Sequence, residues 1–528
     1  PQYNRDESTA SGHCNAWFAD NAKKALLAHA GVGTVDQLML AVLQSKHQCL
    51  RLLGLRGKVI VLDEVHAADR YMQGILETLL RFHAAAGGSV ILLSATLPLS
   101  MRRAYVRAFC QGLGRETPEL HCQAYPLLTH VSRSQQQEHP LESRASVSRT
   151  LKLNLIDNEQ AAINALLTAA QAGQCACWVR NTVDAACAAY DSLKALLPED
   201  QLTLFHARFT QHDRKRIEDQ VLDRFGREST AEQRAGRIVI GTQVLQESLD
   251  VDFDHMVSDL APIDLLLQRA GRLRRHTRDS QGNTINGKDQ RGKATLLVLS
   301  PNPAEVTDKH WLSQTLPRAE LIYPDHGLLW KTAELIRRKG QIKIPSDLRD
   351  WIEAVYDEEH ESKAPDYRLD TPETLMEWSD EAYADSLKQQ DLASANRIDF
   401  DTGYTRQGQW WDEARTPTRL GEESITLRLA RLDNGVIQPW SDDPKHPWHL
   451  SEVRVLAKRV SKQADYEAQG LGQGVEAVMQ SWKGAAKFAV LVVMEASEND
   501  TWMGEARSAS DKPIRLRYSP VSGLAFSD

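Results

Sequence analysis

The strongest constraint on the fold is a pair of short aliphatic runs early in the chain. The runs, 59–62 and 90–93, contain only Val, Ile and Leu, which is typical of buried strands in a parallel sheet. Apolar residues between them recur with helical spacing at Met72, Ile75, Leu76, Leu79 and Leu80. This pattern predicts a βαβ unit whose helix packs on the sheet.

A second series of aliphatic runs begins after a polar stretch near residue 135. Candidate strands lie at 175–179, 202–205, 238–240, 256–260 and 295–299, with helical segments near 184–197 and 212–225. The alternation predicts a second α/β domain, and a length of 528 residues predicts about three folded units. We expect a first α/β lobe, a second α/β lobe, a linker or helical region, and a more strand-like accessory domain. Their expected bounds are 1–135, 136–305, 306–424 and 425–528.

Composition narrows the class of protein. Hydrophobic residues make up 42% and charged residues 25%, as in folded soluble domains. No apolar run approaches the roughly 20 residues that span a bilayer, so we expect no membrane anchor. The seven Cys form no CxxC pair and no secretory signal opens the chain, which favours reduced thiols and a cytoplasmic location. The net charge of −8 argues against non-specific coating of nucleic acid but permits a local basic groove.

The tryptophans concentrate beyond Pro301, where ten of the twelve lie. Such side chains can stack on unpaired bases, but Trp without interleaved Lys or Arg more often packs in a core. We favour the core interpretation.

The sharpest chemical feature is the sequence that follows the first aliphatic run, Asp63-Glu64-Val65-His66. Ligands of open α/β sheets bind at the carboxyl ends of strands. There Asp63 can hold Mg²⁺ and Glu64 can orient or deprotonate an attacking water, as phosphoryl transfer requires. The plain alternative is a strand that ends in acids on the surface. The second run closes on Ser94 and Thr96, whose hydroxyls can hydrogen-bond the first site and pass a change there to the rest of the domain.

The second domain carries an arginine-rich segment, 268–275, after the candidate strand 256–260. If the run from Asp264 is helical, Gln268, Arg272 and Arg275 share one face. Two guanidiniums then converge on one target, which suits phosphate charge. The alternative is a solvated helix face, although no acid occurs between residues 265 and 275.

In this order the segments resemble motifs II, III, V and VI of superfamily-2 helicases: strand-DEVH, strand-SAT, Gly241-Thr242-Gln243 with Glu247-Ser248-Leu249-Asp250, and QRAGRLRR at 268–275. The extended DEVHAAD at 63–69 and LFHARF at 204–209 are similar to the CRISPR-associated DEVH-box helicase/nuclease of type I interference systems. The resemblance implies an α/β fold with two RecA-like, P-loop-NTPase-type domains and a C-terminal accessory region.

The resemblance also implies partners and roles. It implies ATP and Mg²⁺ as cofactors and a motor that moves 3′ to 5′ along single-stranded DNA after recruitment by an RNA-guided surveillance complex. Asp63, Glu64, His66, Arg272 and Arg275 would be catalytic. ATP binding and coupling would involve Gln268, Asp250, Ser94 and Thr96. Nucleic acid would contact Thr34, Arg208, Thr242 and Gln243.

Two parts of that family do not occur in the sequence. No G-x-x-x-x-G-K-[ST] precedes Asp63, and the near match from Gly282 to Asp289 has an acid where the hydroxyl belongs, so we expect a polar loop there. The nuclease centre would need a His-Asp pair in an N-terminal domain, whereas His212-Asp213 lies in the second lobe, where Asp213 is better interpreted as a helix cap. We therefore expect a fragment with an incomplete first lobe that hydrolyses ATP poorly alone, its nuclease and P-loop segment lying elsewhere.

Two other functions remain open at this point. One is another DExH-box helicase, acting in DNA repair or RNA remodelling. The other is a non-catalytic nucleic-acid-binding or docking module.

Overall fold

The computed structural model describes residues 25–527 with eight internal gaps. The gaps are 145–146, 247–248, 309, 357–366, 403–416, 421–422, 483–488 and 498–499. The chain divides into two compact units, each assembled from separate stretches. Unit 1 comprises Pro1–Ser148, Ile344–Leu369 and Met376–Leu420, and unit 2 comprises Arg149–Lys343, Asp370–Leu375 and Gly421–Asp528. The boundary expected at residue 135 falls inside unit 1, and the region 306–424 is shared between the units.

Unit 1 contains the βαβ unit that the aliphatic runs predict. Strands β1 (Val59–Leu62) and β2 (Ser89–Leu92) are parallel, in register from Val59 opposite Ser89 to Leu62 opposite Leu92. Helix α5 (Arg70–Ala85) connects them, and Asp69 caps it by accepting the Met72 N–H at 2.8 Å. The predicted apolar stripe of α5 is buried in the core of this unit. Burying each such side chain stabilises the fold by about 1.5–3 kcal/mol.

The two-stranded sheet is covered on one face only, within the described residues. Ile60 and Leu62 are 5% exposed, but the alternate side chains of Val59 and Val61 are 62% and 57% exposed, and Ile91 is 48% exposed. The expectation of fully buried strands is therefore wrong for one face. The reason is that α5 and α6 (Leu99–Leu113) both contribute to the core on the opposite face.

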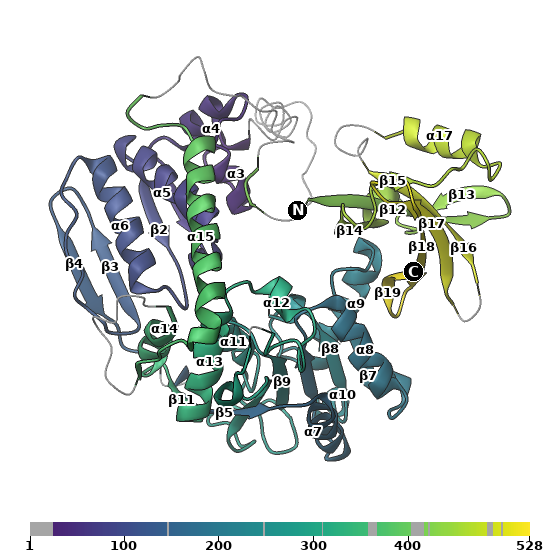
Figure 1. The fold of residues 1–528 in the computed structure, drawn as a ribbon, viewed down its shortest axis with the longest axis horizontal. Helices are drawn as coiled ribbons and strands as arrows, with labels where there is room; N and C mark the ends of the chain where they lie inside the picture. Colours follow the sequence, from purple (N-terminus) through teal and green to yellow (C-terminus); the bar gives the residue numbers. More distant parts are fainter. Residues whose placement is uncertain are drawn as a thin grey trace. The chain divides into compact units, whose positions relative to one another are not determined.

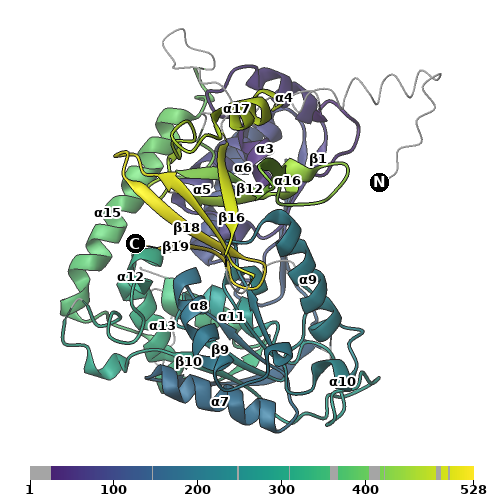
Figure 2. The same cartoon turned by 90° about the vertical axis from the view of Figure 1, so that its right-hand side faces the viewer.

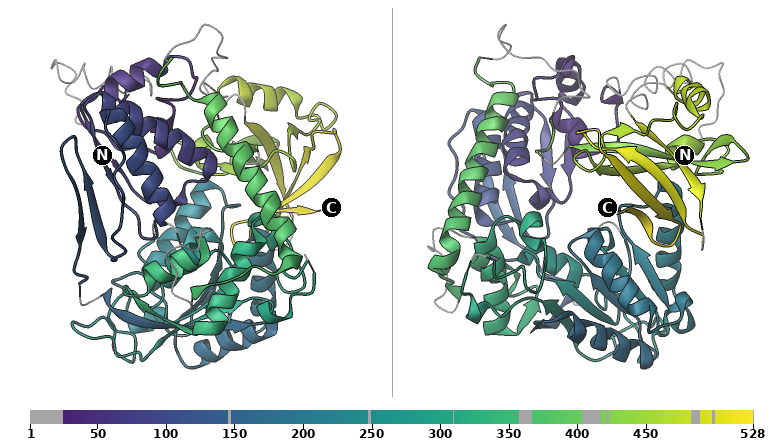
Figure 3. Two further views of the ribbon diagram at one scale, coloured as in Figure 1. Left: turned by 60° about the vertical axis from the view of Figure 1, so that its left-hand side comes forward. Right: turned by 45° about the vertical axis from the view of Figure 1, so that its right-hand side comes forward.

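The rest of unit 1 packs around this sheet. It includes the helices α3 (Val35–Met39), α4 (Gln48–Leu55) and α14 (Leu348–Tyr356), and most of α15 (Glu373–Asn396). The antiparallel hairpin β3 (Leu127–Val131) and β4 (Gln136–Pro140) lies beside α6 (Figures 1 and 3), where Arg102 pairs with Glu138 at 3.3 Å. The chain after α15 returns to the N-terminal part of the unit, since Ile398 donates its N–H to Val42 at 2.8 Å.

Unit 2 contains a seven-stranded sheet in the order β11-β5-β10-β9-β6-β8-β7. Its strands are β5 (Arg149–Ile156), β6 (Ala176–Val179), β7 (Leu202–Phe205), β8 (Ile238–Gly241), β9 (His255–Asp259), β10 (Ala294–Leu299) and β11 (Gln341–Ile344). The pairs from β5 to β7 are parallel. Every residue of β6, β7 and β8 is buried, so the aliphatic runs here predicted their environment correctly. The strand β5 was not predicted.

Helices follow the strands of this sheet. They are α7 (Glu159–Gln171), α8 (Val183–Lys194), α9 (Gln211–Phe225), α10 (Ala231–Arg234), α11 (Ile263–Ala270), α12 (Ala319–Ile322) and α13 (His326–Lys339). The predicted helices at 184–197 and 212–225 correspond to α8 and α9.

The C-terminal part of unit 2 is an eight-stranded sheet (Figure 2). Its strands are β12 (Ser424–Asp433), β13 (Val436–Pro439), β14 (Glu452–Leu456), β15 (Lys462–Gln463), β16 (Val490–Ala496), β17 (Trp502–Arg507), β18 (Pro513–Ser519) and β19 (Gly523–Ser527), with helices α16 (Pro447–Leu450) and α17 (Gly472–Gln480). Strands β12 and β16 are parallel, and β16 to β19 form an antiparallel meander. This strand-rich character agrees with the sequence pattern beyond residue 425.

Among the eight tryptophans beyond Pro301 that the structure describes, five are buried, as we expected. Those at 311, 330, 351, 440 and 482 are at most 7% exposed, while Trp410 and Trp411 lie outside the described residues. Trp440 and Tyr518 meet edge to face with ring centroids 4.7 Å apart. No helix in the described part of the chain is both long and apolar enough to cross a bilayer.

Candidate functional site

The end of β1 presents two exposed carboxylates, those of Asp63 and Glu64. Asp63 Oδ1 accepts the N–H of Glu64 at 2.9 Å. Glu64 adopts a left-handed conformation, with φ 54° and ψ 40°. A non-glycine residue in this region costs on the order of 1–3 kcal/mol and persists where the surrounding structure enforces it, often at functional sites. The turn therefore directs Glu64 outward at the carboxyl end of the strand.

His66 connects the acidic turn to the segment after β2. Its side chain is only 2% exposed, and its Nδ1 lies 3.4 Å from Glu64 Oε2 and 2.9 Å from Ser94 Oγ. Ser94 Oγ also accepts the N–H of Thr96 at 3.3 Å. The hydroxyl of Thr96 is buried and has no hydrogen-bond partner among the described residues. A displacement of the Glu64 side chain can therefore be transmitted to the Ser94–Thr96 segment through the buried imidazole ring of His66.

Helix α14 holds the same segment from its other end. Glu353 Oε1 accepts the N–H of Leu99 at 2.9 Å, and Arg349 Nη1 donates to the carbonyl of Leu97 at 2.9 Å and to Glu353 at 3.0 Å. Both side chains are nearly buried, at 11% and 12% exposed. The hydroxyl of Tyr125 donates to the carbonyl of Ala95. In sequence, Arg349 and Glu353 are indistinguishable from an ordinary i,i+4 surface pair.

Thr34 immediately precedes helix α3 in unit 1. It is the exposed N-cap residue of α3 and has extended backbone geometry, with φ −81° and ψ 155°. Its side chain makes no capping hydrogen bond.

The residues after β8 are ordered by their neighbours within unit 2. Thr242 is 3% exposed and precedes a 3₁₀ turn, Gln243–Leu245. Gln243 Nε2 donates to the carbonyl of Asn181 at 3.1 Å. Glu247 and Ser248 of the same motif lie outside the described residues.

The arginine-rich segment is not one continuous helix, so the predicted common face of Gln268, Arg272 and Arg275 is wrong. Helix α11 ends at Ala270, and Arg274 has a left-handed φ of 49°. The backbone leaves the helix because it pairs with Phe253, which donates its N–H to Arg272 at 2.9 Å and accepts that of Arg274 at 2.8 Å. This partner is remote in sequence and invisible to periodicity.

The two expected catalytic arginines make different contacts. Arg275 Nε donates to Asp250 Oδ1 at 2.6 Å, and His276 Nε2 lies 3.1 Å from the same oxygen. Arg272 Nη2 donates to the carbonyl of Gln246 at 2.9 Å. Burial raises the pKa of Asp250, but the hydrogen bond from Arg275 and the neighbouring His276 outweigh it, so that this pKa lies below its ordinary value.

Arg269, in the middle of the motif, is a structural residue. Its fully buried guanidinium donates to Gln246 Oε1 at 2.9 Å, Ser258 Oγ at 2.8 Å and the Asp259 carbonyl at 3.0 Å. It also reaches Asn181 Oδ1 at 3.2 Å. Arg269 thus ties α11 to the end of β9 and to the loop after β8. Nothing in the sequence separates it from Arg272.

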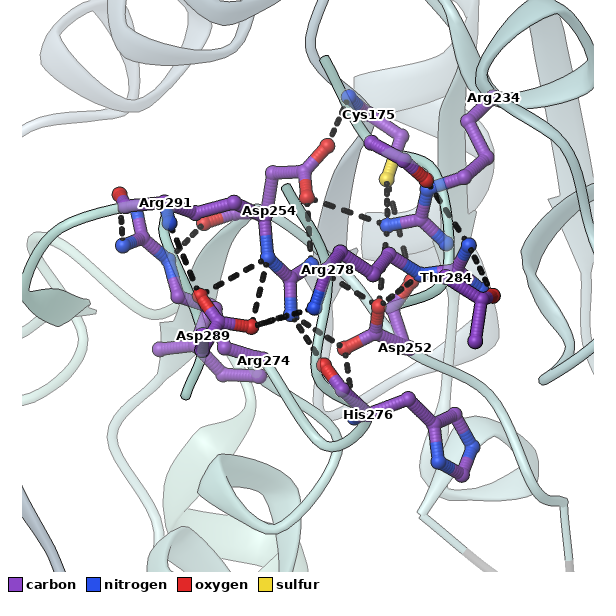
Figure 4. Close-up of polar contacts among 12 residues, drawn as sticks. Cys175, Arg234, Asp252, Asp254, Arg274, His276, Arg278, Thr284, Asp289 and Arg291 are labelled. Carbon is purple, nitrogen blue, oxygen red and sulfur yellow. Dashed lines mark hydrogen bonds and ion pairs between the residues drawn. The ribbon is translucent and has the colours of Figure 1, made fainter. Parts of the chain in front are cut away.

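A buried network of charges anchors the loop between α11 and β10 (Figure 4). Asp252 Oδ2 accepts from Arg278 Nε at 2.8 Å and from Arg291 Nη1 at 2.9 Å. Asp254 Oδ1 accepts from Arg291 Nη1 at 2.7 Å and from Arg234 Nη2 at 3.1 Å. Burial raises the pKa of Asp254, but the charges of Arg234 and Arg291 together hold it well below its usual range. We call these five residues the buried charge network.

The loop from Gly282 to Asp289 belongs to this anchored region. Asp289 accepts the N–H of Arg278 at 3.1 Å and pairs with Arg291 at 2.7 Å. The near match to a phosphate-binding sequence is therefore a loop held in place by its acid.

At His212-Asp213, as elsewhere among the described residues, no group of three or more His, Cys, Asp or Glu side chains is placed to hold a metal ion. Asp213 is also not the helix cap that we expected, because Thr210 caps α9. The Asp213 carboxylate is buried and accepts from Tyr518 at 2.7 Å and Trp440 at 2.8 Å. It joins α9 to the C-terminal sheet.

Arg208 follows β7 and pairs with Asp184 at the start of α8, with Nη1 2.5 Å from Oδ1. The neighbouring His206 is fully buried. Its Nδ1 accepts the Arg208 N–H at 3.1 Å and its Nε2 lies 3.2 Å from the Ser522 carbonyl. These contacts define a neutral ring with the proton on Nε2. Burial and the charge of Arg208 lower the pKa of His206 to about 3.

Comparison with known proteins identifies the family. The family model for the C-terminal region of the CRISPR-associated nuclease/helicase Cas3 matches residues 172–278. The chain is 35% identical over 373 residues to the CRISPR-associated endonuclease/helicase Cas3 of Escherichia coli (strain K12), covering 68% of this chain and 38% of that protein. It matches the crystal structure of T. fusca Cas3-ATP with a TM-score of 0.76 and 28% identity, over 97% of this chain and 58% of that chain. The chain belongs to the Cas3 helicase family.

A further solved structure with a similar chain is a CRISPR RNA-guided surveillance complex in a pre-nicking state. Its TM-score is 0.71 at 28% identity, over 96% of this chain and 61% of that chain. The Cas3 crystal structures confirm the α/β fold with RecA-like domains. The chain spans less than two thirds of the length of each of these Cas3 relatives.

Proposed function

We propose that this chain is the motor portion of an ATP-dependent helicase that moves 3′ to 5′ along single-stranded DNA. In this proposal it unwinds invader DNA and helps to degrade it in CRISPR interference, after an RNA-guided surveillance complex recruits it. One observation carries the proposal: the exposed Asp63 and Glu64 at the carboxyl end of β1, with Glu64 in a left-handed conformation and linked through His66 to Ser94. The Cas3 relatives support the proposal, since the Escherichia coli protein is named an endonuclease/helicase and the T. fusca crystal structure is of Cas3-ATP.

The acids of β1 take separate roles in ATP hydrolysis. Glu64 orients or deprotonates the attacking water, because its carboxylate is 60% exposed and free to meet a ligand from solvent. Asp63 would hold Mg²⁺, which neutralises phosphate charge when bound. One exposed carboxylate fits this ion, since Mg²⁺ in nucleotide sites keeps several waters and phosphate oxygens as ligands. His66, Ser94 and Thr96 relay the state of the nucleotide to the rest of unit 1.

Residues of unit 2 take further proposed roles in ATP hydrolysis. Arg272 and Arg275 stabilise γ-phosphate charge, Gln268 contacts ATP, and Asp250 holds Arg275 until the nucleotide arrives. Because Arg275 is 40% exposed and Asp250 51% exposed, their ion pair contributes little to stability and can exchange for a phosphate.

Single-stranded DNA is the proposed track. Thr242 and Gln243 follow β8 and Arg208 follows β7, at the carboxyl edge of one parallel sheet. Thr34 provides a further contact from the exposed N-cap of α3. A surveillance complex is the proposed recruiting partner, since a chain similar to this one is part of a solved CRISPR RNA-guided surveillance complex.

The decisive experiment replaces Glu64 by Gln in the full-length gene product. The variant keeps the size of the side chain but removes the base, so we expect DNA-stimulated ATP hydrolysis to fall by about 10²–10⁴-fold while ATP binding persists. Glu116→Gln is the matched control, because Glu116 is also an exposed carboxylate of unit 1. Malachite-green phosphate release and a strand-separation assay measure the two activities.

The outcomes separate the candidate functions. DNA unwinding that survives in Glu64→Gln would contradict the motor assignment. A wild-type protein that binds DNA but hydrolyses no ATP would indicate a non-catalytic binding module instead. Hydrolysis stimulated by RNA but not by DNA would indicate an RNA-remodelling helicase.

A further inference from the structure

Three arginines from distant parts of unit 2 surround a single carboxylate, that of Asp184 in the first turn of α8. Arg208 Nη1 lies 2.5 Å from Asp184 Oδ1, and Arg318 Nη1 lies 2.7 Å from Oδ2. Arg459 Nη2, from the loop after β14, lies 3.4 Å from the same Oδ2. We call Asp184, Arg208, Arg318 and Arg459 the Asp184 arginine cluster.

The cluster carries a surplus of positive charge. Guanidiniums stay protonated at all physiological pH values. Burial raises the pKa of Asp184, but the hydrogen bond from Arg208 and the charges of Arg459 and Arg318 outweigh this effect, so the pKa lies below its ordinary value and the group is an anion at neutral pH. One negative charge thus faces three positive charges, on a chain whose formal net charge is −8.

This surplus lies at the surface. The side chain of Arg318 is 61% exposed and that of Arg459 is 35% exposed, while Arg208 at 20% lies deeper. Each guanidinium has five N–H donors in a fixed fork. Within the described residues, Arg318 and Arg459 use single nitrogens for Asp184. Donors therefore remain for an anionic ligand that arrives from solvent.

An aromatic ring fixes two of the guanidiniums. The guanidinium carbon of Arg459 lies 4.9 Å from the ring centroid of Phe526, and that of Arg208 lies 5.5 Å away. Both are within the range of cation–π attraction. Strand β19, which carries Phe526, is itself held to the loop after β7 because Leu524 donates its N–H to the Arg208 carbonyl at 2.7 Å.

The approach of β19 to that loop is close enough to require glycine. A Cβ on Gly523 would lie 2.7 Å from His206 Cε1 and 2.8 Å from the Arg208 carbonyl oxygen, and its φ is +70°. The cluster is therefore assembled by the C-terminal sheet and the parallel sheet together. It is preorganised rather than a chance meeting of flexible surface side chains.

The place of the cluster in the fold indicates the kind of ligand. Strands β6, β8 and β7 are parallel neighbours in that order. Asp184 follows β6, Gln243 follows β8 and Arg208 follows β7, so their carboxyl ends form one edge, where ligands of α/β sheets bind. The Gln243 side chain reaches the Asn181 carbonyl, just before α8, at 3.1 Å. This edge connects the cluster to the residues that we propose for the DNA track.

We propose that the Asp184 arginine cluster binds the phosphodiester backbone of single-stranded DNA, with Arg318 and Arg459 as contacts additional to Arg208. The inference rests on the proposed function and extends the DNA track onto the C-terminal region. Guanidinium forks match phosphate geometry. Asp184 acts as a local counter-charge: it orders the three arginines when no DNA is present and opposes the phosphate when DNA binds.

The opposite signs of these charges give opposite predictions. Each phosphate contact on single-stranded nucleic acid contributes about −0.7 to the slope of log K against log salt. Arg318→Gln and Arg459→Gln should each weaken binding about 3- to 10-fold at low salt and reduce the magnitude of the slope by about 0.7. Asp184→Asn keeps the shape and removes the opposing charge, so it should tighten binding.

The experiment uses the full-length gene product and a fluorescein-labelled oligothymidine, without ATP, over a series of NaCl concentrations. Fluorescence anisotropy gives the affinities. Arg337→Gln is the matched control, because Arg337 is a 46% exposed arginine of unit 2 that pairs with Glu334 on α13, outside the cluster. Thermal unfolding of each variant checks that the fold is intact.

Each outcome has a distinct meaning. Weaker binding by both arginine variants, tighter binding by Asp184→Asn and no change in Arg337→Gln would support the site. If Arg318→Gln and Arg459→Gln bind like the wild type, or if Asp184→Asn binds more weakly, the cluster is structural and the inference is wrong. Equal competition by poly-glutamate of the same charge would show an acidic-peptide surface instead. If the wild type binds no DNA, the proposed function itself fails.

Discussion

Replacing Arg278 by Met tests whether the buried charge network holds the loop that carries Arg275. Arg278 is fully buried, and its Nε donates to Asp252 Oδ2 at 2.8 Å. Its terminal nitrogens donate to four backbone carbonyls, those of Gly226 at 2.9 Å, Arg227 at 3.1 Å, Ser229 at 2.7 Å and Gly282 at 2.9 Å. Methionine has an unbranched side chain that can follow the same path but has neither charge nor donors.

The expected loss follows from these contacts. Removing one partner of a buried ion pair costs about 3–5 kcal/mol, because the remaining charge loses its compensation. Asp252 retains its ion pairs with Arg291 at 2.9 Å and Arg234 at 3.2 Å. The electrostatic part of the loss in stability should therefore lie at the lower end of this range. The carbonyls that lose their donor add about 1 kcal/mol each at most. We therefore expect a total of about 3–7 kcal/mol.

Hydrogen exchange followed by mass spectrometry is the suitable measurement, because it reports on the loop itself. A loss of about 3 kcal/mol corresponds to a roughly 100-fold decrease in protection, which should appear in peptides that cover residues 276–293 and 226–234. Arg278→Lys keeps the charge but cannot reach all the carbonyls, so its effect should be intermediate. Arg337→Met removes a 46% exposed arginine whose buried partner, Glu334, keeps its ion pair with Arg338 at 2.6 Å, so it should cost only about 1 kcal/mol.

A specific result would refute this reasoning. If Arg278→Met protects residues 276–293 as well as the wild type does, an apolar side chain replaces the ion pair without loss, as happens in some proteins. The loop would then be held by its backbone contacts and not by the charges.

Three further predictions concern other parts of the molecule. Glu353→Ala leaves the N–H of Leu99 without its acceptor. DNA-stimulated ATP hydrolysis in the full-length protein should therefore fall about 10-fold at unchanged KM for ATP. If α14 only contributes stability, the rate of hydrolysis should not change. His206 is buried and neutral with a folded pKa of about 3, below its unfolded value of 6.5, so its contribution to stability is complete above pH 6.5 and decreases as pH falls below it. In urea unfolding, the wild type should therefore lose about 2 kcal/mol more than His206→Gln between pH 7.5 and pH 5. Asp250→Asn should change the free energy of unfolding by less than about 1 kcal/mol yet reduce ATP hydrolysis about 10- to 100-fold, since Arg275 loses the negative charge that positions it; unchanged kcat would remove both from the mechanism.

The sequence alone determined the local features of this protein. Aliphatic runs placed β1, β7 and β8, because strands of a parallel sheet are rich in Val, Ile and Leu; β7 and β8 are buried along their whole length, and β1 is buried on one face. Asp63 and Glu64 could also be placed from the sequence, because they come directly after the last aliphatic residue of β1. The order of such segments was sufficient to indicate the helicase family, which the comparisons then confirmed.

The tertiary structure decided those features that depend on contacts between residues remote in sequence. Helix α11 ends at Ala270 because the following backbone pairs with Phe253, a contact that helical periodicity cannot reveal. The aliphatic face of Val59 is exposed within the described residues because burial depends on which element covers a strand and not on the strand itself.

The arginines show this division most clearly. Arg269 is buried and joins α11 to the end of β9. Arg278 is a buried ion-pair partner of Asp252, and Arg318 is an exposed member of the Asp184 arginine cluster. All three are the same residue type in polar stretches, and their own sequence neighbours do not separate them. Their roles follow from where the fold places carboxylates and carbonyls, because the energy of a charge depends on its surroundings and not on its place in the chain.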